Sequence, residues 1–415
     1  MFGRSAMVLV TALLMFPQIV ETIYSPALTD ISRYFSISAA EAAQTLSVYF
    51  IGFAVGVLYW GRFSDRYGRR PALLAGLATY ALGCVLALAA RDFTLLLVAR
   101  ILSAFGAATG SVVSQTILRD RFNGRQLAAL FSMMGLVLAV SPAAGVYLSG
   151  AIVAGWGMHG VLTALALLAA VLLLLCCWLL PETRPPQHVH TAFLPLLRQM
   201  ATDKSLALAV LLVAAFNVSL FSYYSLAPFI FAQLRQGSVA FGYSGIALAV
   251  GSLAGALFNR WLLRKAVAEA GILLLACLIQ LISSVAVFCL ADTLLFLLPM
   301  MGITCAYAMA IPLLLGTALG AYGHCRGTAG AIFGLAYYVL IGLGLAAVGW
   351  GQSLGGTLIV SASVSCIAGL RYGCCLRDMR EGGDLTRPRG SACGYQPFAA
   401  GGVEKMDFLA PYRQR

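Results

Sequence analysis

Charged residues are scarce in this chain. Only 10% of the 415 residues are Asp, Glu, Lys or Arg, whereas 61% are hydrophobic and the mean hydropathy is +0.90. Soluble domains carry about 25% charged residues, so too little polar surface is present to cover a water-soluble fold. The alternating ten-residue segments typical of transmembrane barrels are also missing. The composition therefore predicts an all-α membrane protein.

Motifs for catalysis and cofactor binding are missing as well. The four histidines fall at predicted loops or span ends, and none has metal-ligand spacing with the eleven cysteines. The sequence contains no HExxH, no GxSxG and no phosphate-binding GxxxxGKS/T motif. We therefore expect no enzyme activity, no cofactor and no metal. An ATP-driven pump within this chain is excluded, which leaves transport driven by a gradient.

Long apolar runs dominate what remains. A helix needs about 20 apolar residues to cross a bilayer core, and twelve such windows can be placed. The fold expected is a bundle of twelve transmembrane helices in two six-helix halves. The windows lie at about 7–29, 43–62, 72–90, 93–116, 128–150, 158–180, 206–232, 240–262, 270–290, 294–319, 328–350 and 354–372.

A polar break with three prolines separates the sixth window from the seventh. Within it, 192–200 is expected to form an interfacial amphipathic helix. The end of the chain is rich in Gly, Pro and charge, which predicts disorder. The predicted domains are an N-terminal half at 1–180, a cytoplasmic linker at 181–205, a C-terminal half at 206–373 and a cytoplasmic tail at 374–415.

The basic residues of the loops predict the orientation. One side of the predicted spans holds fourteen loop Lys and Arg residues and the other holds three, namely Arg33, Arg91 and Arg235. Cytoplasmic loops carry the excess of Lys and Arg, so both termini are expected in the cytoplasm. This bias also accounts for most of the net charge of +12 without nucleic acid as a partner.

One acidic residue, Glu21, is expected deep inside a span. A lone carboxyl in hydrocarbon costs a few kcal/mol, so the usual interpretation is a proton or ion site. Helical offsets place Gln18, Thr22 and Ser25 on the same face as Glu21. Because polar stripes facing lipid are disfavoured, this face should line a central cavity or another helix.

Arg100 in the fourth predicted span is the expected partner of Glu21. At 1.5 Å per residue, Glu21 lies about 12 Å and Arg100 about 10 Å from the outer ends of their spans. The two charges can therefore share a depth and pair. A purely structural ion pair is one interpretation. The other is proton coupling, in which a proton on Glu21 breaks the pair and biases the helices.

Aromatic and polar residues at mid-span depth suit a small amphipathic substrate, although each alone is also compatible with packing. Thr45, Tyr49, Gly52 and Gly56 share a face of the second span, where the glycines are expected to serve helix packing. Asn217, Phe221, Tyr224 and Pro228 follow similar spacing in the seventh, and Tyr307, Tyr337 and Tyr338 can add to them. The substrate-binding candidates are Gln18, Ser25, Tyr49, Ser103, Asn217, Phe221 and Tyr224.

The loop after the second span carries the densest motif. Its glycines permit a tight turn, and its acid and arginines can pair with a neighbouring helix end, forming a conformational latch. A basic loop that only sets the topology is the alternative. The motif residues are Gly61, Asp65, Arg66, Gly68, Arg69 and Arg70.

These residues match G-x-x-x-D-R-x-G-R-R, the loop signature of the major facilitator superfamily, which the chain resembles in layout over all twelve spans. The runs IYSPAL at 23–28, QTLSVYF at 44–50 and WGRFSDRYGRRP at 60–71 resemble the bicyclomycin-resistance (Bcr/CflA) drug/proton antiporters of the bacterial inner membrane. That group commonly has an acid two residues before the YxP tyrosine. Here Thr22 stands there and Glu21 precedes it, about 100° around the helix.

Two further family motifs are matched in part. Arg100 begins a run similar to R-x-x-Q-x-x-G, with Ser103 in place of Gln, and the resemblance implies proton coupling for this arginine. Pro142 and Gly145 resemble the antiporter motif G-P-x-x-G, with Ser141 in place of the first Gly. The resemblance implies a helix bend whose close packing limits leak.

The leading hypothesis is proton-coupled efflux of small drug-like or amphipathic compounds by alternating access. The expected partners are a small-molecule substrate, protons and the lipid bilayer, with the chain acting as a monomer. One alternative is uniport or proton-linked transport of a metabolite such as a nucleoside or sugar. Another is a membrane receptor or scaffold that has lost transport. Glu21, the loop motif and Pro142 favour efflux.

Overall fold

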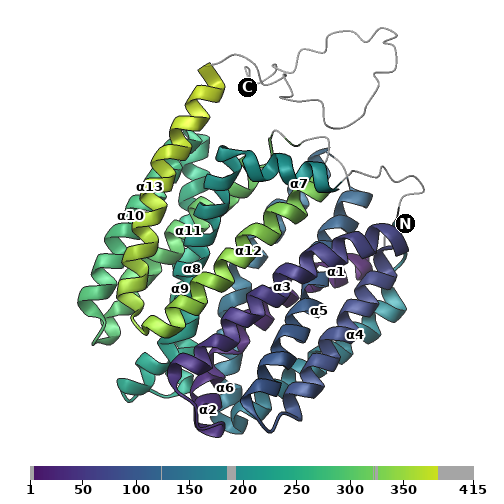
Figure 1. Ribbon diagram of the computed structural model, residues 1–415, viewed down its shortest axis with the longest axis vertical. Coiled ribbons are helices and arrows are strands. Elements are labelled where there is room, and N and C mark those ends of the chain that lie inside the picture. Colours follow the sequence, from purple (N-terminus) through teal and green to yellow (C-terminus); the bar gives the residue numbers. More distant parts are fainter. Residues whose placement is uncertain (1–3, 123, 185–192, 321, 323–325, 382–415) are drawn as a thin grey trace.

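The computed structural model describes residues 4–122, 124–184, 193–320, 322 and 326–381. These residues form an all-helical bundle (Figure 1). Its elements are α1 (Arg4–Ile23), η1 (Ser25–Ala27), α2 (Leu28–Tyr34), α3 (Ala39–Tyr67), α4 (Arg69–Leu88), α5 (Phe93–Arg121), α6 (Gly124–Leu179), α7 (Phe193–Thr202), α8 (Lys204–Gln233), α9 (Ser238–Arg264), α10 (Glu269–Leu290), η2 (Leu294–Phe296), α11 (Leu297–Thr317), α12 (Arg326–Gly351) and α13 (Leu354–Glu381).

In the described part of the chain, eleven helical segments are long and apolar enough to cross a membrane. One of them belongs to α6, which runs for 56 residues and leaves helical geometry at Gly157, with φ 59° and ψ −156°. Glycine tolerates this positive φ without steric cost. The break divides α6 into two crossings, at the position where the apolar windows predict a turn between 150 and 158. The bundle therefore has the twelve crossings that the sequence predicts.

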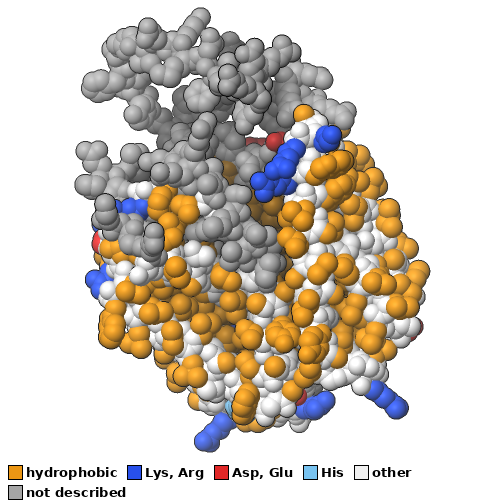
Figure 2. All heavy atoms as spheres, turned by 180° about the vertical axis from the view of Figure 1, so that it is seen from behind, with side chains coloured by type: hydrophobic (Ala, Val, Ile, Leu, Met, Phe, Trp, Pro, Cys, Tyr) orange, Lys and Arg blue, Asp and Glu red, His pale blue; other side chains and the backbone are white. Residues whose placement is uncertain are grey.

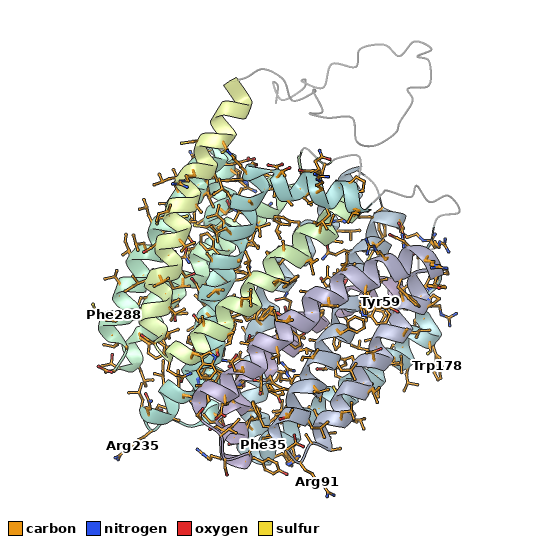
Figure 3. All side chains as sticks on the ribbon, viewed as in Figure 1. Phe35, Tyr59, Arg91, Trp178, Arg235 and Phe288 are labelled. Atoms are coloured by element: carbon orange, nitrogen blue, oxygen red, sulfur yellow. The ribbon has the colours of Figure 1, made fainter. Side chains whose placement is uncertain are left out.

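The crossings run between two ends of the bundle. The start of α1, α7 and the end of α13 lie at one end, called here the α7 end, and α2 lies at the opposite α2 end (Figure 1). Arg91 and Arg235 project from the α2 end, whereas Trp178 and Phe288 point sideways from the bundle (Figure 3). Hydrophobic side chains cover the wall between the ends, and Lys and Arg side chains cluster near the ends (Figure 2).

Three clusters of buried apolar residues hold the bundle together. One lies within α1 to α6, called here the N-half, and a second lies within α7 to α13, the C-half. The third joins the halves by packing Leu46, Phe50 and Val146 of the N-half against residues of the C-half such as Phe221 and Ile341. The two halves therefore share an apolar contact surface.

Side-chain caps fix several helix starts. Ser38 and Glu41 form a capping box at the start of α3, and Asp92 and Asp203 cap α5 and α8 through backbone N–H groups. A helix is observed where the interfacial helix is expected, as α7. The last helix departs from the prediction, because α13 continues to Glu381 and so includes the start of the tail predicted at 374–415. Residues 382–415 lie outside the described residues.

Candidate functional site

Glu21 lies two residues before the end of α1, in the interior of the bundle. Its side chain is 2% exposed, and its Oε1 atom has no hydrogen-bond partner among the described residues. Pro26 lacks an N–H to donate to the carbonyl of Thr22, so α1 ends here and continues as η1 and α2. The carboxyl therefore lies beside a break in the first span rather than along a continuous helix.

Arg100 of α5 is also buried, at 2% exposure, but the expected ion pair with Glu21 is not formed. The salt bridges of Arg33 with Asp30 and of Arg69 with Asp65 and Asp120 involve neither residue. The Arg100 guanidinium lies 3.9 Å from the ring centroid of Tyr24 and 4.6 Å from that of Tyr49. A planar guanidinium stacks well on aromatic faces, and these rings take the place expected for the carboxylate. Arg100 still interacts electrostatically with Glu21.

Tyrosines from both halves lie within electrostatic range of Glu21. Tyr49 comes from α3, Tyr224 from α8, Tyr307 from α11, and Tyr337 and Tyr338 from α12. A charge at Glu21 is therefore felt by helices on both sides of the contact between the halves. The sequence offered Tyr49, Tyr224 and the later tyrosines as substrate-binding residues, and the structure places them around the one buried carboxyl of the first span.

Phenylalanines complete an aromatic group at the contact between the halves. Phe221 meets Phe50 edge-on, with ring centroids 4.7 Å apart, and Tyr338 stacks on Phe50 at 6.2 Å. Asn217 accepts a hydrogen bond from the Tyr307 hydroxyl at 3.2 Å. Sequence reasoning missed Phe50. Its place within the QTLSVYF run was a usable signal, because it directly follows Tyr49.

Two other substrate-binding candidates lie apart from this group. Gln18 is half-buried, one helical turn from Glu21 toward the α7 end. Ser103 donates a hydrogen bond to the carbonyl of Arg100 at 2.9 Å and packs against Gly83 of α4. In this structure Ser103 lies at the contact of α4 with α5, and its role in substrate binding stays a prediction. A serine is small enough to let α4 and α5 approach closely, and that contact buries it.

Ser25 joins the halves. Its hydroxyl donates a short hydrogen bond to the carbonyl of Tyr224 in α8. In a regular helix the N–H of residue 228 would bond that carbonyl, but residue 228 is a proline. Ser25 thus supplies the donor that Pro228 cannot, and both Ser25 and Tyr224 are buried. The structure assigns the Ser25 hydroxyl to this bond, although the sequence counted it among the substrate-binding groups.

Further hydrogen bonds between the halves gather toward the α2 end, and we call this set together with Ser25–Tyr224 the seam. Ser47 donates to the carbonyl of Gly342 at 2.7 Å. The other two are Gln44 to Ala346, at 3.2 Å, and Ser238 to Gly150, at 3.2 Å. The cleft beside Arg33 and Gln236 at the seam holds only about 50 Å³. The bundle is closed at this end.

Glycines bring the helices close to one another. A Cβ atom on Gly52 would lie 2.6 Å from the carbonyl oxygen of Ile101 in α5, which confirms the expected packing role of this glycine. Gly145 of α6 lies against Thr22, and a Cβ there would be 3.1 Å from the carbonyl oxygen of Ile19. Pro142 lies inside α6 without interrupting it. Gly145 of this motif therefore packs against α1, at the residue that follows Glu21.

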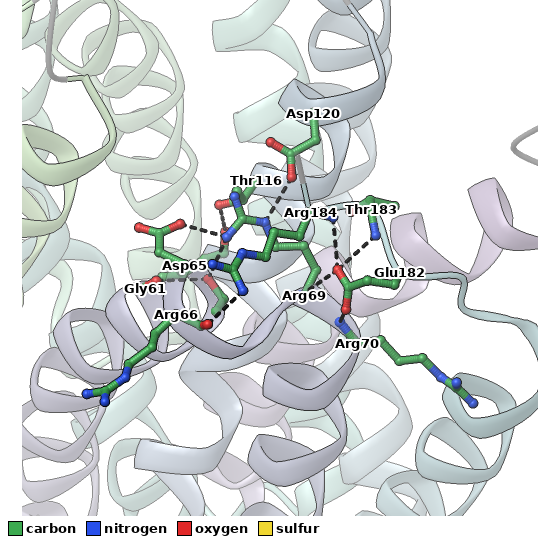
Figure 4. A network of polar contacts seen from close by, with 12 residues as sticks. Gly61, Asp65, Arg66, Arg69, Arg70, Thr116, Asp120, Glu182, Thr183 and Arg184 are labelled. Carbon is green, nitrogen blue, oxygen red and sulfur yellow. Dashed lines mark hydrogen bonds and ion pairs between the residues drawn. The ribbon is translucent and has the colours of Figure 1, made fainter. Parts of the chain in front are cut away.

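The loop motif forms a network within the N-half (Figure 4). Arg69 is 3% exposed and donates to Asp65 of α3 at 2.6 Å and to Asp120 of α5 at 2.8 Å. The Arg66 carbonyl accepts a hydrogen bond from Arg184 at 2.7 Å. Asp65 therefore pairs with Arg69 of the same motif, and Arg69 also binds Asp120 of α5.

Glu182, which follows α6, completes the network and was not found from the sequence. Its carboxylate accepts hydrogen bonds from the N–H groups of Arg69 and Arg70 at 2.9 and 3.1 Å, at the start of α4. Partial burial raises the pKa of this carboxyl, but four backbone N–H bonds outweigh burial, so its pKa lies below the ordinary 4.5. Gly68, with φ 110°, turns the chain beside it. The loop thus joins α3, α4, α5 and the end of α6.

Twelve membrane crossings in two halves, with a buried carboxyl at their contact, define a membrane transporter. The family model of the Major Facilitator Superfamily matches residues 10–365. The chain belongs to this family, whose members carry small molecules across membranes.

Several known proteins are similar to the chain. An uncharacterized transporter of Rickettsia bellii (strain RML369-C) is 32% identical over 339 residues, which cover 78% of this chain and 84% of that protein. Multidrug resistance protein D of Escherichia coli (strain K12) is 30% identical, covering 43% of this chain and 45% of its own. A bicyclomycin resistance protein homolog of Haemophilus influenzae (strain ATCC 51907 / DSM 11121 / KW20 / Rd) is 27% identical, covering 42% and 44%.

The fold is shared with a solved transporter. The crystal structure of a D-xylose-proton symporter superposes with a TM-score of 0.72 at 16% identity and covers 90% of this chain and 97% of that one. At this identity the likeness concerns the fold alone.

Proposed function

We propose that this protein exports small drug-like or amphipathic compounds in exchange for protons, with Glu21 as the proton carrier. The observation that carries the proposal is the buried Glu21 carboxyl, which has an unpartnered oxygen among the described residues and lies within electrostatic range of Arg100. A buried carboxylate without a direct partner is costly, whereas the protonated acid is neutral. Gain or loss of one proton therefore changes the free energy of this site strongly.

The coupling follows from what surrounds the carboxyl. Ionised Glu21 acts on Arg100 in the N-half and on tyrosines such as Tyr224 and Tyr337 in the C-half. A proton removes that interaction and so changes the relative free energies of conformations in which the halves lie closer or farther apart. The aromatic group around Phe50 and Phe221 offers the apolar and stacking surface that an amphipathic substrate needs.

Orientation and location are part of the same proposal. The excess of basic loop residues supports an orientation with the α7 end and both termini in the cytoplasm, in a bacterial inner membrane. The seam then lies on the outer side, and the conformation described is closed to the outside. One chain contains the whole transport path, so a monomer suffices. The relatives named as multidrug and bicyclomycin resistance proteins support export as the direction.

Transport in inside-out vesicles with an imposed pH gradient tests the proposal. Substrate flux and proton flux are measured together for wild type, for Glu21→Gln and for the matched control Asp292→Asn, which changes an exposed acid at the α2 end. The compounds tested are amphenicols, bicyclomycin-like compounds and nucleosides. Coupled flux that disappears only in Glu21→Gln is the expected result. Substrate flux without proton movement in the wild type would contradict the proposal and favour uniport of a metabolite. Proton movement in the same direction as the substrate would contradict exchange and favour symport.

A further inference from the structure

A groove opens between α8 and α13 on the outer wall of the C-half, at the α7 end. It has a volume of about 640 Å³. Ala207, Leu208 and Leu211 of α8 and Leu370 of α13 form its apolar wall, and Lys204 and Arg371 belong to its lining as well. This groove lies on a different face from the contact between the halves, and transport as proposed above does not use it.

Charge and apolar surface are separated along the groove. Lys204 is the first residue of α8, and Leu211 lies seven residues further into the span, which is about 10 Å along the helix. Both Lys204 and Arg371 are exposed. The groove therefore runs from a basic mouth, level with the end of the bundle, into the apolar wall.

Asp203, the residue before Lys204, is held by hydrogen bonds away from the two basic side chains. Asp203 accepts hydrogen bonds from the N–H groups of Ser205 and Leu206 at 3.0 and 3.2 Å, through one oxygen. Its other oxygen accepts from the Tyr322 hydroxyl at 2.9 Å. Both carboxylate oxygens are thus engaged with the start of α8 and with Tyr322, and the charged residues that line the groove, Lys204 and Arg371, are both basic.

We propose that the groove is a binding site for an anionic phospholipid. The lipid phosphate would lie between the Lys204 ammonium and the Arg371 guanidinium, and an acyl chain would follow Leu208 and Leu211 toward the membrane centre. Basic residues between helices at the cytoplasmic surface attract anionic headgroups. Ala207, with its small side chain, gives the groove the depth that a chain needs. A zwitterionic lipid offers the same chains but less net attraction.

Native mass spectrometry of the purified full chain tests this proposal, with phosphatidylglycerol as the probe and phosphatidylcholine of identical chains as its control. We expect Lys204→Gln/Arg371→Gln to bind phosphatidylglycerol about thirtyfold more weakly than wild type. The matched control Arg264→Gln/Lys265→Gln, which removes two exposed basic residues at the end of α9, should bind like wild type. Ala207→Trp, which keeps both charges and fills the groove, should also weaken binding.

Four outcomes would overturn the proposal. They are equal affinity of wild type and the Lys204/Arg371 variant, equal affinity for the two lipids, full binding by Ala207→Trp, and displacement of the lipid by soluble glycerol phosphate, which would identify a free phosphate as the ligand. The substituted side chains are exposed, so the variants are expected to fold. Thermal melting of each variant without added lipid checks this independently of the lipid readout.

Discussion

The hydrogen bond from Ser25 to the Tyr224 carbonyl offers a sharp test of how the α2 end of the bundle closes. Ser25→Ala removes the hydroxyl and leaves a buried carbonyl to which Pro228 cannot donate. Interhelical hydrogen bonds in membranes contribute about 0.6 kcal/mol on average and about 1.7 kcal/mol at most. The closed population should therefore fall relative to the open one by about threefold to about eighteenfold.

Ser47→Ala is the matched control within the same seam. It also removes a hydrogen bond between the halves, but the carbonyl of Gly342 that it leaves belongs to a regular part of α12 and keeps the N–H of Ala346 as a helical partner. For Ser47→Ala, the closed population should therefore fall relative to the open one by about threefold or less. The difference between the two serines isolates the effect of the proline.

Spin labels at Arg33→Cys and Gln236→Cys, with the native cysteines replaced, report the opening. Both positions line the small cleft at the seam, one in each half. Distance distributions from pulsed electron paramagnetic resonance should gain a longer component in Ser25→Ala. In a Pro228→Ala background, where residue 228 can donate again, the same serine substitution should have a smaller effect. An unchanged distribution in Ser25→Ala, or an equal effect with and without Pro228, would refute the reasoning.

Two further predictions concern the N-half. Gly52→Ala drives a Cβ against the backbone of Ile101, so it should destabilise the protein by about 1–3 kcal/mol in thermal melting, whereas Gly316→Ala, with no atom within 4 Å, should not. The pKa of Glu182 is lowered in the folded protein, so its contribution to stability is present above pH 4.5 and is lost as the pH falls through the folded pKa. Glu182→Gln should therefore make the free energy of unfolding depend less on pH on the acid side. Equal acid sensitivity of the variant and the wild type would contradict this.

The spans were predictable because hydrocarbon demands about 20 apolar residues from every crossing helix. The same rule located the turn inside α6, since apolar windows on either side left room for only a few residues around Gly157. It could not locate the end of α13. Beyond the membrane no length rule applies, and the helix continues to Glu381 through residues that are polar and charged.

The depth of the site residues was predictable, but their partners were not. Counting residues placed Glu21 and Arg100 at one level. It could not show that Tyr24, directly after the end of α1, and Tyr49 of α3 lie against the Arg100 guanidinium. Glu182 was missed for a similar reason. Its bonds join residues more than a hundred positions apart in the chain, and no local pattern marks an acid in a linker as the cap of another helix.

The break after Glu21 places three consecutive residues in three different contacts. Tyr24 stacks on Arg100, Ser25 donates across the seam, and Pro26 ends the helix that carries Glu21. If Glu21 carries the proton, as proposed, a change in its charge acts on Arg100 and so on the ring that directly precedes the seam serine. The path from proton to seam then spans five residues of one segment. Glu21→Gln should therefore change the seam distances in the same spin-label assay, and Ser25→Ala should remove part of that response, because both act through this segment.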